Sequence, residues 1–365
     1  MPTELTNRAL NRALLARQGL LEPWDCSVIE AIERLIALQA QAPMAPYFGL
    51  RSRLAGFVPK ELSTLLLDRR VVRIALMRST LQLVSARDCL ALRPILQADL
   101  VRVLPPQLRN RVDLAEIVER ARELVDERPV TFAELGRTLA GHFPDVSPDD
   151  LSRIARNSLA LVQITPRGVW GSAMTATHSS AESWLGRPLD SNSCPDELIL
   201  RYLRAFGPAT VADIAAWSGM AGLRPQLERL RPRLRSFVNP RGQELLDVVD
   251  GLLPAADQPV PVRIIAEFDN LLLAHADRDR IFAGADRMRF ISVNGLVSST
   301  FLIDGFVAGT CKLSRSKGTA TVTFRPFTKL RKVDRAALQV EGARLIDFGA
   351  ADADRTEVVI EAADL

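Results

Sequence analysis

The sequence predicts an α+β protein built from several domains, and three observations carry this prediction. The chain has 365 residues, which is too many for one small hydrophobic core and suits two to four domains. Up to residue 256, one order of elements recurs three times, with helices followed by two short strands. Beyond Pro261 the pattern changes to strands separated by turns, which indicates a small, mostly antiparallel β domain.

The first repeat shows apolar residues at helical spacing, then two runs rich in β-branched and apolar residues. Helices are expected over residues 5–20, 27–38 and 60–67, and strands over residues 72–76 and 80–84. The second repeat is expected to hold helices over residues 114–125, 131–140 and 148–161, and a hairpin of residues 162–165 and 169–170. The third is expected to hold helices over residues 195–205, 210–218 and 223–230, and strands over residues 234–238 and 245–249.

Three helices followed by a β-hairpin are the arrangement of a winged helix. We therefore predict three tandem winged-helix units followed by the β domain. That domain is expected to contain strands over residues 262–268, 290–293, 299–303, 307–313 and 320–324, and a helix over residues 333–348. The expected domain boundaries are residues 1–105, 106–190, 191–256 and 257–365.

Composition narrows the class of protein. Apolar residues make up 47% and charged residues 25%, as in ordinary globular proteins, and no run of about 18 apolar residues predicts a membrane span. The N-terminus lacks the pattern of a signal peptide. The four cysteines are far apart, so neither a disulfide framework nor a zinc site is expected, and a reducing cytoplasm fits best.

Residues 311–332 form a strongly basic stretch with seven basic residues and no acidic one. Lys317 and Gly318, between two strand-like runs, indicate a hairpin turn, so Lys312, Arg315 and Lys317 are expected near its tip. Such a tip suits phosphates or a DNA groove. Two alternatives stay open: a solvated hairpin, or a surface that pairs with the acidic C-terminal residues 347–365.

Residues 38–43 read LQAQAP, which sets two glutamines in an apolar stretch. In a helix, Gln39 and Gln41 would point about 200° apart, whereas in an extended chain they share a face. Pro43 disfavours helix at the residue before it, so the helix is expected to end close to Gln39. The two carboxamides could then hold one water molecule and polarise it weakly. The alternative is a capping or surface role.

Other catalytic patterns are weak. The three histidines are isolated, and neither a metal-binding spacing nor a P-loop or a nucleophile elbow is found. The stretch of residues 268–278 contains Asp269, His275 and Asp277, which suits either a catalytic or metal-binding cluster or a network that orders a loop.

With these residues in view, the chain resembles the bacterial winged-helix DNA glycosylases of the AlkZ/YcaQ type along nearly its whole length. The segments that carry the resemblance are RALNRALLARQGLL, LQAQAPMAPYFGLRSRL, LMRSTLQLVSARD, AEFDNLLLAHADR, FLIDGFVAGTCKL and PFTKLRK. The resemblance implies three winged helices and a β domain curved around a basic, concave DNA-binding face. It also implies that a hairpin of the C-terminal part, best matched around residues 312–317, contacts DNA.

The resemblance implies that Gln39 and Gln41 are catalytic, because the AlkZ branch has the motif Gln, apolar residue, Gln. The YcaQ branch has aspartate where this chain has Gln41, so the chain is placed with the branch that unhooks interstrand crosslinks, including those of the azinomycin type. The apolar residue in the middle of the motif is Ala40 in this chain, which is a small side chain for that position. Residues on the matching segments give the expected DNA-binding set: Arg51, Arg53, Arg78, Asn270, His275, Arg278, Lys312, Arg315 and Lys317.

The implied reaction is water-mediated hydrolysis of the N-glycosidic bond of an N7-alkylated purine. Alkylation makes the base a cationic leaving group, so weak activation of water suffices. Gln41 is expected to orient the water and Gln39 to assist or to stabilise the sugar cation. The lysine nearest in sequence is Lys60, which favours a monofunctional enzyme.

The expected partner is double-stranded DNA carrying alkylated or crosslinked purines. No metal, cofactor or membrane is expected, and the protein is expected to act as a monomer on the nucleoid in the cytoplasm. Two alternatives are a non-catalytic winged-helix regulator that binds DNA and a resistance protein that binds the genotoxin itself.

Overall fold

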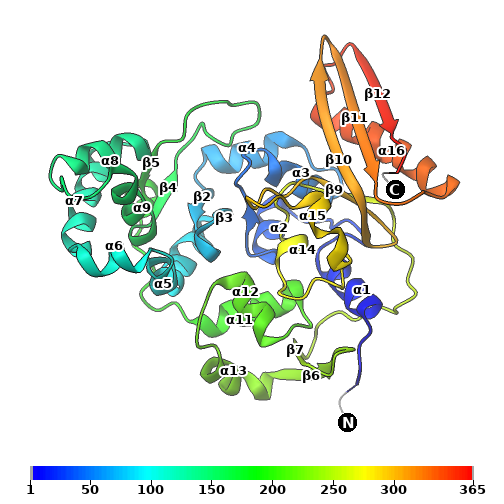
Figure 1. The fold of residues 1–365 in the computed structure, drawn as a ribbon, viewed down its shortest axis with the longest axis horizontal. Coiled ribbons are helices and arrows are strands. Elements are labelled where there is room, and N and C mark those ends of the chain that lie inside the picture. The colour runs from blue at the N-terminus through cyan, green and yellow to red at the C-terminus, as the bar shows by residue number, and fades with distance from the viewer. Residues whose placement is uncertain (1–2, 364–365) are drawn as a thin grey trace.

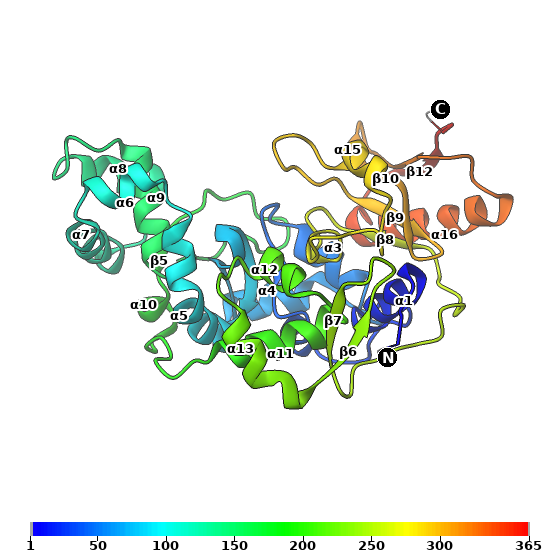
Figure 2. The same ribbon diagram turned by 60° about the horizontal axis from the view of Figure 1, so that its bottom comes forward.

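The computed structural model describes residues 3–363, with the backbone alone at residue 111. It is a mixed α+β structure, as the sequence predicts (Figure 1). Helices α7–α9 lie at one end of the molecule, and the C-terminal sheet with α16 lies at the other (Figures 1 and 2).

Among its described residues, the first part of the chain holds five α-helices and three strands. Its helices begin at side-chain caps where the sequence supplies them, as at Ser27, which forms a capping box with Glu30. The elements are α1 (Asn7–Arg17), α2 (Val28–Arg34), β1 (Leu38–Gln39), α3 (Ala45–Arg51), α4 (Pro59–Leu67), β2 (Val71–Ala75), β3 (Leu81–Ser85) and α5 (Ala86–Arg102).

One expectation for this part is wrong, and one helix of the structure is not among the expected elements. The helix expected to run to residue 38 ends at Arg34, because Ile36 adopts a positive φ of 67° and the chain turns into strand β1. Pairing with β3 then holds Leu38 and Gln39 in extended backbone. Helix α3 was not predicted: its apolar residues were interpreted only as the flank of the glutamine motif, although Pro46 stands in its first turn, where proline is tolerated.

The second part contains α6 (Pro106–Arg111), α7 (Leu114–Glu127), α8 (Phe132–Ala140), α9 (Pro148–Ser158), β4 (Leu161–Gln163), β5 (His178–Ser180) and α10 (Ala181–Leu185). The expected strand at residues 169–170 is wrong, because β4 pairs with β5 instead. Trp170 is drawn into a different core, where its ring lies 4.9 Å from that of Tyr47.

Strands from these two parts form one five-stranded sheet in the order β1-β3-β2-β4-β5. All its neighbouring strands are antiparallel. Because directly paired residues point to the same side of a sheet, Gln39, Gln82, Ile74 and Val162 share one face. The register therefore decides which side chains accompany the first glutamine of the motif.

The third part contains α11 (Pro195–Phe206), α12 (Val211–Ser218), α13 (Arg224–Leu230), β6 (Leu234–Val238) and β7 (Glu244–Val248). Each boundary lies within one residue of the prediction. Short 3-10 turns occur at Met77–Ser79, Arg231–Arg233 and Gly284–Asp286.

The C-terminal part contains β8 (Arg263–Ile265), α14 (Asn270–Leu273), α15 (Arg287–Phe290), β9 (Thr300–Ile303), β10 (Phe306–Ser316), β11 (Thr319–Pro326), α16 (Lys332–Gly349) and β12 (Arg355–Ile360). Its sheet has the order β12-β11-β10-β9-β8 and is antiparallel except where β12 runs parallel to β11. The expected strand at 290–293 is wrong: α15 ends at Phe290, and Ile291 forms only an isolated bridge with Val297. Strand β12 was not predicted.

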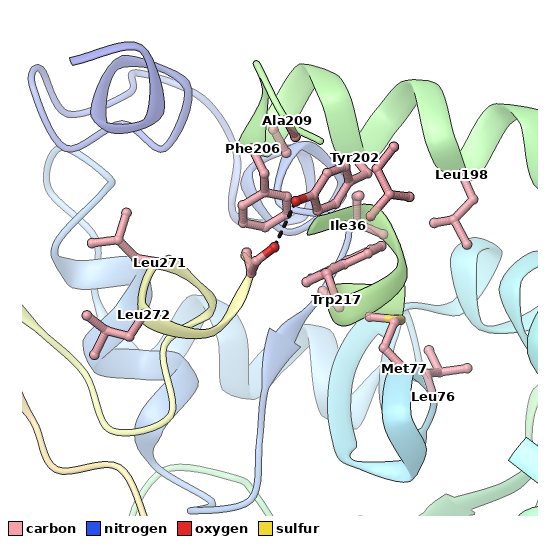
Figure 3. Close-up of a cluster of buried hydrophobic side chains, with 14 of the residues drawn as sticks. Ile36, Leu76, Met77, Leu198, Tyr202, Phe206, Ala209, Trp217, Leu271 and Leu272 are labelled. Carbon is pink, nitrogen blue, oxygen red and sulfur yellow. Dashed lines mark hydrogen bonds between the residues drawn. The ribbon is translucent and has the colours of Figure 1, made fainter. Parts of the chain in front are cut away.

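The largest core joins segments that are far apart in the sequence. Helices α11 and α12 contribute Tyr202, Phe206 and Trp217, and α14 contributes Leu271 and Leu272 (Figure 3). The Tyr202 hydroxyl donates a hydrogen bond of 2.8 Å to the carbonyl of Ala274 (Figure 3). This packing fixes α14 beside the sheet that carries the glutamine motif. Among the described residues, no helix is long and apolar enough to cross a membrane.

Candidate active site and nucleic-acid interface

Gln39 occupies strand β1, where its side chain is only 8% exposed. Its Cα atom lies opposite that of Gln82 on β3. Its Oε1 atom is buried and has no hydrogen-bond partner among the described residues. A buried acceptor without a donor costs about 1–3 kcal/mol, so this orientation is more typical of a ligand-binding group than of a structural one.

Gln41 follows at a bend and is exposed. The amide of Ala40 donates to the carbonyl of Leu81 at 2.8 Å, so the backbone stays extended to that point. Alternate residues of an extended chain point to the same side. The motif therefore presents one buried and one exposed carboxamide at the edge of the sheet.

Asn270 lies beside this strand at the start of α14. Its Nδ2 donates to the carbonyl of Ala37 at 2.9 Å, while its Oδ1 is buried without a donor. The structure thus brings Asn270 against Ala37, two residues before Gln39, from a position more than 200 residues away. Asn270 is one of the expected DNA-binding residues, but its burial and its bond to Ala37 make it a support for the glutamine strand.

Arg53 and His275 lie in the interior, so we remove them from the expected set of DNA contacts. The Arg53 side chain is 1% exposed, and its guanidinium binds both carboxylate oxygens of Asp269 at 2.8 Å. His275 is 2% exposed and its Nε2 lies 3.0 Å from the carbonyl oxygen of Phe206. Burial, followed by the charge of Arg280, lowers the pKa of His275 and keeps its imidazole neutral.

The polar stretch 268–278 consequently behaves as a network that orders a loop, one of the two interpretations left open by the sequence. Asp269 pairs with Arg53 and caps α14, His275 bonds to backbone, and Asp277 lies 3.0 Å from Arg241. Among the described residues, no group of three or more His, Cys, Asp or Glu side chains could hold a metal ion.

Strained backbone surrounds the glutamine strand. Seven described residues other than glycine have a positive φ. Four of them stand close in sequence to Gln39, Gln82 or Asn270; these are Ile36, Arg78, Ser79 and Phe268. Each such conformation costs about 1–3 kcal/mol and persists where the surrounding packing enforces it, which is frequent at functional sites.

A cavity of about 310 Å³ begins directly after the motif. It is lined by Ala42, Met44, Phe48, Glu267 and Lys312, among others. Glu267 has no hydrogen bond or ion pair within the described part of the chain, and partial burial raises the pKa of its carboxyl. A larger hollow of about 490 Å³ is lined by residues such as Arg17 and Arg204 and does not include the glutamines.

The basic hairpin is formed by β10 and β11, with a turn at Lys317 and Gly318 whose φ angles are 48° and 77°. Lys312, Arg315 and Lys317 are all exposed. Arg315 lies 2.8 Å from Asp352, whereas Lys312 and Lys317 have no acidic partner between residues 3 and 363. Asp352 of the acidic tail therefore pairs with the hairpin, as one of the alternatives expected, while Lys312 and Lys317 have no acidic partner among the described residues.

The other expected DNA contacts are half-buried. Arg78 donates to the carbonyls of Ala216 and Trp217 at the end of α12, at 3.0 and 2.8 Å. Arg278 donates to the carbonyl of His275 at 3.1 Å. Burial lowers the pKa of both guanidinium groups, and the positive charge of Arg278 lowers that of Arg78 further, so the two cations lie in one region of positive potential.

Arg51 stands on α3, with its guanidinium 5.9 Å from the ring centre of Phe348 and 3.9 Å from Glu341. It also lines the cavity beside the motif. Burial lowers the pKa of Arg51. Its charge is therefore shared with a carboxylate and only partly available to a ligand.

Gln82, which the register of the sheet places opposite Gln39, is not among the site residues expected from the sequence. The sequence carries one signal for it, because Gln82 is a polar residue between the apolar Leu81 and Leu83 of the strand. Without the sheet order, however, nothing in the sequence indicated which strand would lie beside the glutamine motif.

A family model described as DNA glycosylase AlkZ-like matches residues 32–348. The matched range covers most of the chain, which places the protein in the class of DNA glycosylases, enzymes that cleave the N-glycosyl bonds of DNA bases. Within that class, the chain belongs to the AlkZ-like family.

Among solved structures, the chain is similar to the Streptomyces sahachiroi DNA glycosylase AlkZ. The TM-score is 0.81 at 21% sequence identity, and the match covers 98% of this chain and 100% of that one. At this identity, the likeness establishes a shared fold over the whole chain. No curated protein matches the sequence.

Proposed function

We propose that the protein hydrolyses the N-glycosidic bond of N7-alkylated purines in double-stranded DNA, and that its substrates include interstrand crosslinks of the azinomycin type. The observation that carries the proposal is the placement of the Gln39-Ala40-Gln41 motif on extended backbone at a sheet edge. The family match supplies the DNA-glycosylase class, and the motif has the two carboxamides of the AlkZ branch.

In the proposed reaction, the two carboxamides hold the attacking water and face the sugar as positive charge develops on it. A carboxamide is a weak acceptor, so the substrate has to supply most of the driving force. An N7-alkylated purine does so, because its positive charge is neutralised when the bond breaks. No lysine ammonium is required by this scheme, which is therefore hydrolytic and monofunctional.

We propose further that three winged-helix units and the C-terminal sheet bind the duplex together as a monomer. The retained contacts are Lys312 and Lys317 on the hairpin, with Arg78 and Arg278 forming a second cationic region. Arg51 and Arg315 contribute less, since each lies near a carboxylate. A crosslinked base cannot rotate freely out of the duplex, so capture of the lesion in an open groove suits this arrangement.

The test is release of 7-methylguanine, or unhooking of an azinomycin-type crosslink, from a defined duplex. Wild type should release the base and leave an abasic site that alkali cleaves. Gln39→Ala and Gln41→Ala should each reduce the single-turnover rate by about 10²-fold, in the range found for positioned catalytic groups. Lys60→Ala is the control, because this exposed lysine stands on α4 and is expected to leave the rate unchanged.

Failure of wild type to release any alkylated base, or equal rates in wild type and both glutamine variants, would contradict the proposal. Salt-dependent duplex binding without product would instead indicate a winged-helix regulator. Binding of the genotoxin in the absence of DNA would indicate a resistance protein that sequesters it.

A further inference from the structure

Gln82 shares the environment of Gln39 and lies directly opposite it across the β1–β3 pair. Directly opposed residues of an antiparallel pair have Cβ atoms about 4.5–5.5 Å apart, so the two side chains stand next to each other on one face. The next two residues of that row are apolar, namely Ile74 on β2 and Val162 on β4, and Ser179 on β5 ends the row. Two carboxamides on an apolar, buried face are costly unless they bind something.

The orientation of the Gln82 carboxamide is set by its neighbours. Its Nε2 donates to the Thr80 hydroxyl at 2.7 Å, and that hydroxyl donates onward to the carbonyl of Met77 at 2.9 Å. Because the hydroxyl proton is already used, Thr80 can only accept from Gln82, and the amide cannot be reversed without losing this bond. The Gln82 side chain is 1% exposed, and its Oε1 therefore faces the interior without a donor.

Gln39 and Gln82 thus offer two buried acceptor oxygens, on directly paired residues of one sheet face, that no described donor satisfies. One small molecule with two donor hydrogens would satisfy both. We propose that Gln82 is a second acceptor for the attacking water, which it holds together with Gln39. This inference rests on the proposed function, and it reassigns the water from the exposed Gln41 to the buried pair.

A water molecule has two hydrogens to donate, and this number decides its orientation in the proposed site. When both hydrogens point to carboxamide oxygens, the lone pairs of the water point away from the pair, towards a substrate at the sheet edge. The water oxygen then bonds to C1′ of the sugar, the bond from C1′ to N9 breaks, and its electron pair neutralises the cationic base. The extra proton on the new hydroxyl passes to solvent. Gln41, exposed at the same edge, is left free to contact the sugar or the alkylated base.

Gln163 provides a matched control. It belongs to the same sheet and also has a buried Oε1 without a partner. Its register partner is Arg73, which places it on the opposite face from Gln82. A general effect of removing an unsatisfied carboxamide from this sheet would appear equally at both positions, whereas loss of the water site would appear only at Gln82.

The experiment compares Gln82→Leu and Gln163→Leu in the full-length protein by single-turnover release of 7-methylguanine. Gln82→Leu should lower the rate about 10²-fold at saturating enzyme, with DNA affinity within about twofold of wild type. Its Tm should be close to or higher than that of wild type, because removal of the unsatisfied Oε1 offsets loss of the bond from Nε2 to Thr80. Gln163→Leu should retain the wild-type rate.

A second variant separates water binding from packing. Gln82→Glu keeps an acceptor but makes it titratable, so its rate should rise with pH as the carboxyl ionises, whereas the wild-type rate should not show this step. A wild-type rate in Gln82→Leu, equal losses in both leucine variants, or a pH-independent Gln82→Glu would overturn the inference while leaving the proposed function intact. Absence of base release by wild type would overturn the proposed function itself.

Discussion

At Arg53, two hydrogen bonds to one carboxylate join the loop after α3 to the start of α14. The partner, Asp269, also caps α14 through the amide of Leu271 at 2.9 Å. The pair is buried on both sides, with 1% and 2% of the two side chains exposed. Removing one member of a buried ion pair leaves an uncompensated charge, which is more damaging than the pair itself is stabilising. Arg53 therefore holds Asp269 in place, and with it the start of α14 that carries Asn270; it does not face DNA.

Arg53→Ala should accordingly lower the free energy of unfolding by about 3–5 kcal/mol, because it strands the Asp269 carboxylate. Chemical denaturation measures this directly. Lys312→Ala is the comparison: it should leave the free energy of unfolding unchanged and weaken only DNA binding. Wild-type stability in Arg53→Ala would contradict the structural role assigned to the pair.

The environment of Glu267 leads to a second prediction at this scale, which concerns how stability depends on pH. Partial burial raises the pKa of its carboxyl above the usual 4.5, so the charged form is disfavoured in the folded state. Its favourable contribution to stability is present below pH 4.5 and is lost as the pH rises through its raised pKa. Glu267→Gln should therefore raise Tm at pH 7 and leave it unchanged at pH 4. An unchanged or lower Tm at pH 7 would show that the charged form has a partner in the fold.

At the scale of elements, the β10–β11 hairpin and strand β12 act as one unit. The parallel pairing of β12 with β11 brings acidic residues beside the basic hairpin, and Arg315 and Arg325 are matched by Asp352 and Glu361 at 2.8 and 2.9 Å. Exposed pairs of this kind contribute little to stability. Their consequence is that carboxylates of the C-terminal residues pair with the hairpin arginines, whereas Lys312 and Lys317 have no acidic partner in the described part of the chain.

Replacing Lys312 and Lys317 together by alanine should weaken duplex binding at every sequence. If each contacts one phosphate, the slope of log K against log salt should fall by about 2. Binding isotherms at several salt concentrations test this. Arg315→Ala should have a smaller effect, because Asp352 already holds that guanidinium. An unchanged slope in the double variant would exclude the hairpin from the interface.

At the scale of the whole molecule, two buried histidines couple stability to pH. His178 stacks on Phe132 with ring centres 3.8 Å apart, and burial lowers its pKa from 6.5 to about 4. The unfolded chain therefore takes up a proton near pH 6.5, while the folded protein resists doing so until about pH 4. Stability is fully present above pH 6.5 and falls as the pH drops through this window. His275, whose pKa is also lowered by burial, acts in the same direction.

The free energy of unfolding should consequently fall by about 3 kcal/mol for His178 between neutral pH and pH 4. His178→Gln should flatten this part of the pH profile, since glutamine does not titrate. Denaturation midpoints from pH 4 to 8 provide the measurement. Parallel profiles for wild type and variant would contradict the assignment.

The sequence by itself determined the features that depend on neighbouring residues. The helices and hairpin of the third part, the turn at Lys317 and Gly318, and the Gln39-Ala40-Gln41 motif all follow from local periodicity, turn chemistry and a proline. Tertiary structure decided everything that depends on which distant segments meet. The sheet order places Gln82 beside Gln39, and the pairing of Arg53 with Asp269 joins residues 216 positions apart. Local sequence patterns specify which face of a helix or strand is apolar, but only tertiary packing decides which other element covers that face.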